Sequence, residues 1–167
     1  MPFNHLLAHA LIPGVTKASD SGKEAILSPE SGEAVLVFRL DEDITREHLG
    51  IANLKCCDYL FLFKDSNRTL CIFIEFKGSD LSRADEQILS AYQAICRKSE
   101  ALKKLWNGRA RAIIVSSLTA PPKEFDKFQK QLRAEGIELH FGTSRGKPSD
   151  IRKILNHDFK PHSPSKR

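Results

Sequence analysis

The sequence predicts an α/β domain with a central mixed sheet of four to five strands flanked by helices. Its clearest signal is a pair of short apolar runs, residues 59–63 and 70–76, separated by a polar turn at residues 65–68. This pattern is typical of a β-hairpin. A helical pattern and a third apolar run follow, and a strand, a helix and a strand of these lengths form a parallel crossover. A chain of 167 residues with 41% hydrophobic residues fits one domain with its own core.

The other elements follow from local patterns. Strands are expected at residues 34–40, 110–115 and 137–141, the last of them at an edge of the sheet. Helices are expected at residues 81–106, 121–134 and 149–156, and Ser79 or Asp80 is suited to be the N-cap of the first. The apolar side chains of that first helix recur at helical spacing and form one stripe: Leu81, Ala84, Ile88, Ala91, Ile95, Leu102 and Leu105.

The remaining segments are expected to connect these elements. Residues 16–32 are rich in Ser, Gly, Lys and Glu and are predicted to form a loop. Residues 4–11 have a short helical pattern. The acidic residues 41–43 precede a turn or short helix that extends to about residue 54, and negative charge there suits a helix N-terminus.

Composition favours a cytoplasmic protein that makes no membrane contact. No apolar run approaches the roughly 20 residues that cross a bilayer, and the N-terminal segment lacks the basic region of a signal peptide. The four cysteines show no paired C-x-x-C spacing. We expect a single domain at residues 1–159, with its core at about 34–141, and a disordered basic tail at residues 160–167.

Charge is distributed unevenly along the chain. Residues 1–80 contain 8 Lys and Arg against 12 Asp and Glu, whereas residues 81–167 contain 18 against 9. A basic second half beside an acidic first half suits a polyanion bound by one surface and a cation bound by the other. Nucleic acid is therefore the expected partner, although basic helices are often simply solvated surfaces.

Three charged residues interrupt the apolar hairpin: Asp58, Glu75 and Lys77. If Ser66 and Asn67 form a two-residue loop, Asp58 lies directly opposite Glu75, with Cβ atoms roughly 4.5–5.5 Å apart. Lys77 joins them because strand side chains alternate between faces with a period of two. The structural alternative is that Asp58 caps the turn before it and Lys77 only pairs with a carboxylate. Burial of three charges at a strand end is costly without a function, which favours a functional site.

These residues resemble the PD-(D/E)xK nuclease superfamily, which includes restriction endonucleases and Holliday-junction resolvases. The resemblance rests on an acid at the start of one strand, Asp58, a Glu-x-Lys that closes the next, Glu75 and Lys77, and a following helix with an inward Gln. It covers about residues 55–117, and Cys57 stands where the motif has proline. It implies a restriction-endonuclease-like core with Asp58, Glu75, Lys77 and Gln87 as catalytic residues.

The acids of the motif suit a hard divalent cation. Asp58 and Glu75 can supply oxygen ligands to Mg²⁺ or Mn²⁺, and the resemblance adds the backbone carbonyl of Phe76. In the superfamily a further acid often comes from an earlier helix; Glu33 is the first candidate here, before Glu30 and Glu24. Lys77 would orient the attacking water or stabilise charge on the phosphate.

The expected function is therefore metal-dependent hydrolysis of phosphodiester bonds in nucleic acid, with DNA as the expected substrate. One alternative is a catalytically inactive nuclease-fold module that binds nucleic acid or protein in a defence or repair system. Another is an enzyme with the same metal pocket that acts on a small nucleotide. A homodimer is also left open, since cutting both strands of a duplex needs two sites.

Overall fold

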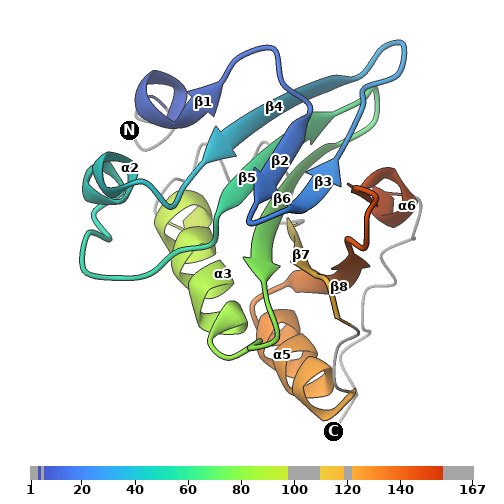
Figure 1. Cartoon of the computed structure of the whole chain (residues 1–167). Coiled ribbons are helices and arrows are strands. Elements are labelled where there is room, and N and C mark those ends of the chain that lie inside the picture. The colour runs from blue at the N-terminus through green and yellow to red at the C-terminus, as the bar shows by residue number, and fades with distance from the viewer. Residues whose placement is uncertain (1–3, 5, 98–109, 119–121, 156–167) are drawn as a thin grey trace, which may run out of the picture.

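A six-stranded mixed sheet forms the centre of the molecule (Figure 1). The computed structural model describes residue 4 and residues 6–97, 110–118 and 122–155. Strand order is β1-β4-β5-β6-β7-β8, antiparallel from β1 to β6 and parallel from β6 to β8. The strands of this sheet are β1 (Leu11–Ile12), β4 (Ala34–Arg39), β5 (Tyr59–Lys64), β6 (Thr69–Lys77), β7 (Ala110–Ser116) and β8 (Ile137–Thr143). The predicted α/β class and mixed sheet are confirmed; β1 brings the strand number to six, above the predicted four to five.

The β5–β6 hairpin has the predicted two-residue loop. The backbone N–H of Asp65 donates to the carbonyl of Arg68 at 3.0 Å, and the Asp65 carboxylate accepts from the N–H groups of Asn67 and Arg68 at 2.8 Å each. The carboxylate thus replaces backbone acceptors in a tight turn. This turn fixes the register, in which Tyr59 pairs with Ile74.

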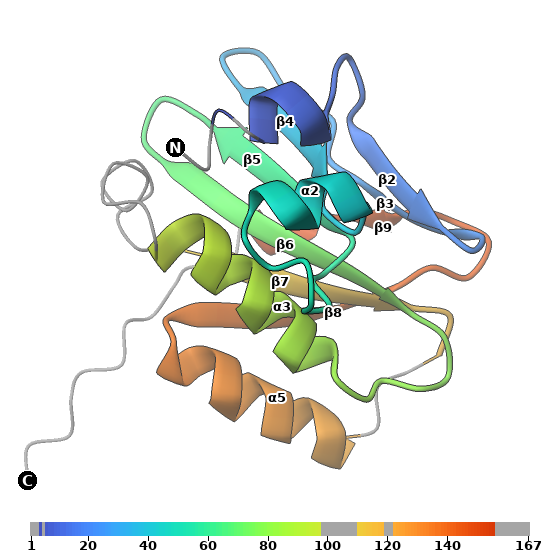
Figure 2. The ribbon, with the colours of Figure 1, turned by 90° about the vertical axis from the view of Figure 1, so that its left-hand side faces the viewer.

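Helices cover one face of the sheet, on the near side in Figure 2. They are α2 (Asp43–His48), α3 (Ala84–Tyr92) and α5 (Pro122–Ala134), together with the π-helical turns η1 (Leu6–Ala10) and η2 (Gln93–Arg97). The apolar stripe of α3 packs on this face, where Ile88 and Ala91 are fully buried beside Phe73 of β6. The sheet face and the helix stripe therefore form the larger of two cores.

Helix α3 begins later than predicted. It starts at Ala84, after Arg83 in the left-handed conformation with φ 62°, and Asp80 accepts a hydrogen bond from the N–H of Ser82 in a preceding turn. Neither Ser79 nor Asp80 is its N-cap. The predicted end of this helix at residue 106 and the basic tail at residues 160–167 both lie outside the described residues.

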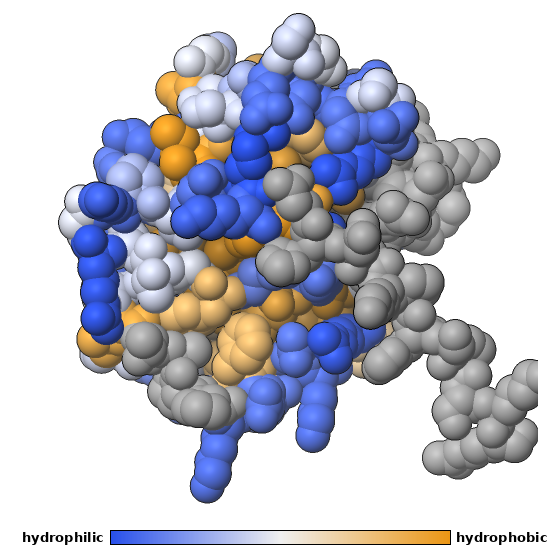
Figure 3. Space-filling view, turned by 90° about the vertical axis from the view of Figure 1, so that its right-hand side faces the viewer, coloured by the Kyte–Doolittle hydropathy of each residue, from blue (hydrophilic) through white to orange (hydrophobic). Residues whose placement is uncertain are grey.

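A second, three-stranded sheet covers the opposite face. It consists of β2 (Lys17–Asp20), β3 (Lys23–Ile26) and β9 (Ser149–Asp150), and the short helix α6 (Arg152–Leu155) follows it. The prediction of a loop at residues 16–32 is wrong, and so is that of an uninterrupted helix at residues 149–156. Figure 3 shows the side opposite to that in Figure 2, with hydrophilic side chains across its upper part and apolar ones between them.

Gly142 of β8 allows the two sheets to approach closely. A Cβ atom at this position would lie 2.3 Å from Oγ and 3.2 Å from Cβ of Ser149 in β9. We expect Gly142→Ala to destabilise the protein by about 1–3 kcal/mol through overpacking, as measured by urea denaturation. Gly78→Ala is the matched control, because a Cβ there meets nothing within 4 Å. Equal stability of the two variants would contradict this account.

The part of the chain that the structure describes contains no helix both long and apolar enough to cross a membrane. Its four cysteines, Cys56, Cys57, Cys71 and Cys96, are all buried free thiols.

Candidate active site

Asp58, Glu75 and Lys77 lie together at one end of the β5–β6 hairpin. Glu75 and Lys77 close β6, and their side chains share the face that carries Phe73 and packs against α3. Asp58 immediately precedes β5, and the register that pairs Tyr59 with Ile74 places Asp58 opposite Glu75. The alternation of side chains and the length of the turn together explain this convergence.

The Asp58 carboxylate is fixed against the strand that carries the other two residues. Its Oδ2 accepts a 2.6 Å hydrogen bond from the backbone N–H of Phe76, and its own carbonyl accepts one of 2.8 Å from Leu40. Because the N–H and C=O of one extended residue point to the same side of the strand, the Phe76 carbonyl also faces the Asp58 side. Burial raises the pKa of Asp58 to about 6, the Phe76 N–H opposes this shift, and the charges of Asp41 and Asp20 add to it.

Glu75 is almost completely buried, with 2% of its surface exposed. Its Oε1 lies 2.9 Å from Nζ of Lys77, whereas its buried Oε2 accepts no hydrogen bond of normal geometry from any residue the structure describes. The N–H of Asp58 faces this carboxyl group and lowers its pKa without meeting that geometry. Burial, followed by the charge of Asp58, nevertheless outweighs Lys77 and raises the pKa of Glu75 to about 8. A buried carboxylate oxygen that accepts no hydrogen bond of normal geometry is costly to the folded protein.

Gln87 of α3 joins the lysine to the segment before β5. Its Oε1 accepts a hydrogen bond from Nζ of Lys77, and its Nε2 donates to the Cys56 carbonyl at 3.4 Å. The backbone N–H of Cys57 donates to the carbonyl of Gln87 at 3.1 Å. The structure therefore brings Gln87 to the site, where the Lys77 ammonium contacts both Gln87 and Glu75.

We expect Gln87→Met to lower the rate of the reaction proposed below by about 10–100-fold, the usual effect of removing a group that orients a catalytic residue. Methionine fills a similar volume but accepts no comparable hydrogen bond from Lys77. Single-turnover rates measure this loss, and Gln87→Glu, which keeps an acceptor, should retain more activity than Gln87→Met. Equal losses in both variants would show that the Lys77 contact is not what matters.

The structure does not bring Glu33 to this site. Glu33 precedes β4 at the end where Ala34 pairs with Lys64, so it lies about 20 Å along the strand from Asp58. Its carboxylate instead binds Arg152, with a shortest contact of 2.6 Å, and this hydrogen bond lowers the pKa of Glu33. In an antiparallel pair, the start of one strand meets the end of the other, which explains the placement.

Two acids that the sequence analysis did not assign to the site approach Asp58 instead; it had expected Asp41 only at a helix N-terminus. Asp41 follows β4 one residue after Leu40, and Asp20 ends β2; both raise the pKa of Asp58 through their charges. Asp41 is bound by Arg39 at 2.9 Å. Asp41 was in principle detectable from the β4–β5 register, but Asp20 depends on a hairpin that the sequence did not predict.

Two carboxylates and one carbonyl are therefore the cation ligands that this site offers. Within residues 6–97, 110–118 and 122–155, no group of three or more His, Cys, Asp or Glu side chains could hold a metal ion. Carboxylate and carbonyl oxygens are the ligands that Mg²⁺ prefers, and Mg²⁺ usually keeps several waters, so one or two carboxylates are enough. The donor set fits this ion.

No family model, no curated protein and no solved structure matches this chain.

Proposed function

We propose that the chain is a metal-dependent nuclease that hydrolyses phosphodiester bonds of nucleic acid, with DNA as the expected substrate. The observation that carries the proposal is the carboxylate of Glu75, which is buried beside a second acid and whose Oε2 accepts no hydrogen bond of normal geometry among the described residues. A protein retains such a costly group where a ligand completes it. A divalent cation is the ligand that two adjacent carboxylates suit best.

The order of the elements supports the resemblance to the PD-(D/E)xK superfamily. An acid immediately precedes β5, a Glu-x-Lys ends β6, and the next helix, α3, directs Gln87 to the lysine. These residues come from three separate elements, so their meeting at one place is not a consequence of sequence proximity alone. The restriction-endonuclease-like core is part of this proposal.

Each side chain has a distinct role in the proposed reaction. Asp58, Glu75 and the Phe76 carbonyl would hold Mg²⁺ or Mn²⁺, which supplies acidified water and polarisation of the phosphoryl group when bound. Lys77, held by Gln87 and beside Glu75, presents a compact positive charge to the scissile phosphate. Because this ammonium is already positioned, it stabilises the growing negative charge with little reorganisation.

The direct test is incubation of the purified chain with single-stranded, duplex and branched DNA and with RNA, with Mg²⁺, Mn²⁺ or EDTA. We expect cleavage of DNA that requires the metal and is lost in EDTA. Mass spectrometry of the products identifies the bond that is cut. A chain that cleaves none of these substrates with either metal is not a nuclease of this kind.

One observation favours the second candidate, an inactive nuclease-fold module that binds nucleic acid or a protein partner in a defence or repair system. The acid expected from an earlier segment, Glu33, is engaged with Arg152 far from Asp58. Calorimetric titration separates the two candidates. Retained DNA affinity without any heat of Mg²⁺ or Mn²⁺ binding would favour the module.

A cytoplasmic location is part of the same proposal. All four cysteines are free and buried, which suits a reducing compartment. Fractionation of cells that produce a tagged chain tests the location.

A further inference from the structure

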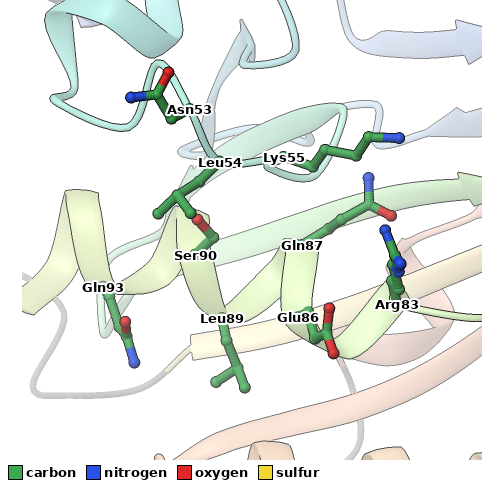
Figure 4. A pocket seen from close by; sticks show the side chains of 9 residues that line it. All are labelled: Asn53, Leu54, Lys55, Arg83, Glu86, Gln87, Leu89, Ser90 and Gln93. Atoms are coloured by element: carbon green, nitrogen blue, oxygen red, sulfur yellow. The ribbon is translucent and has the colours of Figure 1, made fainter.

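A surface pocket lined by both polar and apolar side chains adjoins the candidate active site on the outer side of α3. Its volume is about 540 Å³, and it lies between the segment at residues 53–55 and the helix (Figure 4). Gln87 belongs to both places, because it lines the pocket and also binds Lys77. A ligand in the pocket would therefore continue directly into the site.

Positive charge gathers at the end of the pocket where Gln87 lies. Figure 4 shows the side chains of Lys55, Arg83 and Gln87 converging there, whereas Glu86 points away from them. Lys55 and Arg83 are exposed, and neither forms a hydrogen bond or ion pair with its side chain in the described parts of the chain. Two unpaired cations beside an amide are suited to an anionic ligand rather than to a second protein helix.

The backbone conformation of Arg83 also favours a role for its side chain in binding. Arg83 is one of two non-glycine residues with positive φ among those described, and the left-handed conformation is unfavourable for a residue with a side chain. Glycine would adopt it freely. The position nevertheless carries a long cationic side chain at the mouth of the pocket.

The pocket has the dimensions of a segment of one polynucleotide strand. From Arg83 to Gln93 the helix extends about 15 Å, which corresponds to a few nucleotides at about 3.4 Å per residue of a strand. Asn53, Ser90 and Gln93 provide further polar groups along its length, suited to sugars and base edges. The hydroxyl oxygen of Ser90 is buried and has no hydrogen-bond partner among the described residues.

We propose that this pocket binds the phosphate backbone of the DNA strand that leads to the scissile phosphate, with Lys55 and Arg83 as its phosphate contacts. The proposal rests on the proposed nuclease function and names how its substrate is held. Lys77 then contacts the scissile phosphate, and Lys55 and Arg83 contact the adjacent phosphates of the same strand. Affinity for a strand should depend on salt in proportion to these contacts.

The test measures binding of a fluorescent single-stranded DNA oligonucleotide to the full chain by anisotropy, in EDTA and over a range of salt. We expect Lys55→Gln/Arg83→Gln to lower affinity about tenfold and to make the slope of log K against log salt shallower by about 1.4, or about 0.7 per lost contact. The matched control is Lys64→Gln/Lys153→Gln, two exposed lysines at the far end of β5 and on α6. It removes the same net charge and should leave the slope unchanged.

A separate variant shows whether any loss of affinity comes from misfolding. Arg83→Gly removes the cation and relieves the left-handed conformation, so its midpoint of thermal unfolding should be equal to or above that of wild type. It should still lose affinity. A loss of affinity in this variant is then a loss of contact.

Two results would contradict the proposal that this pocket binds a DNA strand. One is equal affinity and slope in the pocket and control variants, or no binding of the oligonucleotide by wild type. The other is a mononucleotide that competes as tightly as the oligonucleotide, which would assign the pocket to a small nucleotide. If the chain binds DNA through Lys55 and Arg83 but cuts no substrate, the pocket proposal is supported and the nuclease proposal is contradicted. If the chain cuts DNA but the pocket variants bind it as wild type does, the nuclease proposal is supported and the pocket proposal is contradicted.

Discussion

Replacing Glu75 with glutamine is expected to reduce metal-dependent cleavage of DNA by about a thousandfold or more, a loss of roughly 4 kcal/mol of transition-state stabilisation. Glutamine has nearly the same shape and can keep a contact with Lys77, but its amide carries no charge to hold a divalent cation. Single-turnover rates at saturating metal measure the effect on the chemical step.

Glu47→Gln is the matched control for this variant. Glu47 is exposed on α2, so the same substitution there should leave the rate unchanged. Lys77→Met should cause a loss comparable to that of Glu75→Gln, because it removes the positioned charge while keeping most of the side-chain volume. If Glu75→Gln retained cleavage within tenfold of wild type, the Asp58–Glu75 pair would not be the metal site.

Glu75→Gln is also expected to stabilise the metal-free protein relative to wild type, by an amount that increases as pH rises. The pKa of Glu75 is about 8 in the folded protein, against 4.5 as its ordinary value. Between these values the folded chain retains a proton that the unfolded chain has released, so the free energy of unfolding of wild type falls by up to about 1.4 kcal/mol per pH unit. Glutamine does not titrate, so the variant should exceed wild type by a few kcal/mol at pH 8, on the order of the full linkage effect.

Urea denaturation in EDTA at several pH values measures this difference. The two proteins should be similar near pH 4.5 and should diverge as pH approaches 8. Asp58, with a pKa raised from 3.8 to about 6, adds a slope of the same sign between those values in both proteins. Saturating Mg²⁺ at pH 8 should stabilise wild type and leave Glu75→Gln unchanged. Parallel pH profiles of the two proteins in EDTA would contradict the raised pKa of Glu75.

A gain in stability together with a loss of activity would identify Glu75 as a group kept for function. Most surface substitutions change stability little, and a buried charge usually stabilises only when it is fully paired. Glu75 has one oxygen paired with Lys77 and one that accepts no hydrogen bond of normal geometry among the described residues. The two measurements together therefore test whether the site is functional, even before the natural substrate is known.

The sequence predicted the parts of the site that depend on local rules. A two-residue turn and the alternation of side chains along β5 and β6 were enough to place Asp58 opposite Glu75, and both act within the hairpin itself. The helical spacing of apolar residues likewise directed α3 onto the sheet. The β4–β5 pairing, which places Asp41 near Asp58 and Glu33 at the far end, is not fixed by this turn, because a long connection joins the two strands.

Other parts of the fold depend on contacts between distant segments. Strand β3 pairs with β9, where Ala25 lies opposite Ser149, and neither segment has the β-branched and aromatic content that marks a strand. The hairpin that carries Asp20 closes locally through a two-residue turn at Ser21 and Gly22, both with positive φ, but its place over the main sheet, and therefore the charge environment of Asp58, depends on contacts with distant segments. Local patterns do not contain this information, since tertiary packing overrides weak propensity.

The position of β6 within the main sheet has a consequence for how the molecule opens. It is flanked by β5 on one side as far as Ile74 and by β7 on the other as far as Lys77, so its central part, Cys71–Ile74, is paired on both edges. Amide hydrogens of such a strand exchange with solvent only when the whole domain unfolds, whereas peripheral pieces such as β1 and β2 can detach in smaller, cheaper fluctuations. The Glu-x-Lys pair thus directly follows this protected stretch on the same strand, and partial opening at β1 or β2 would leave its pairing with β7 intact.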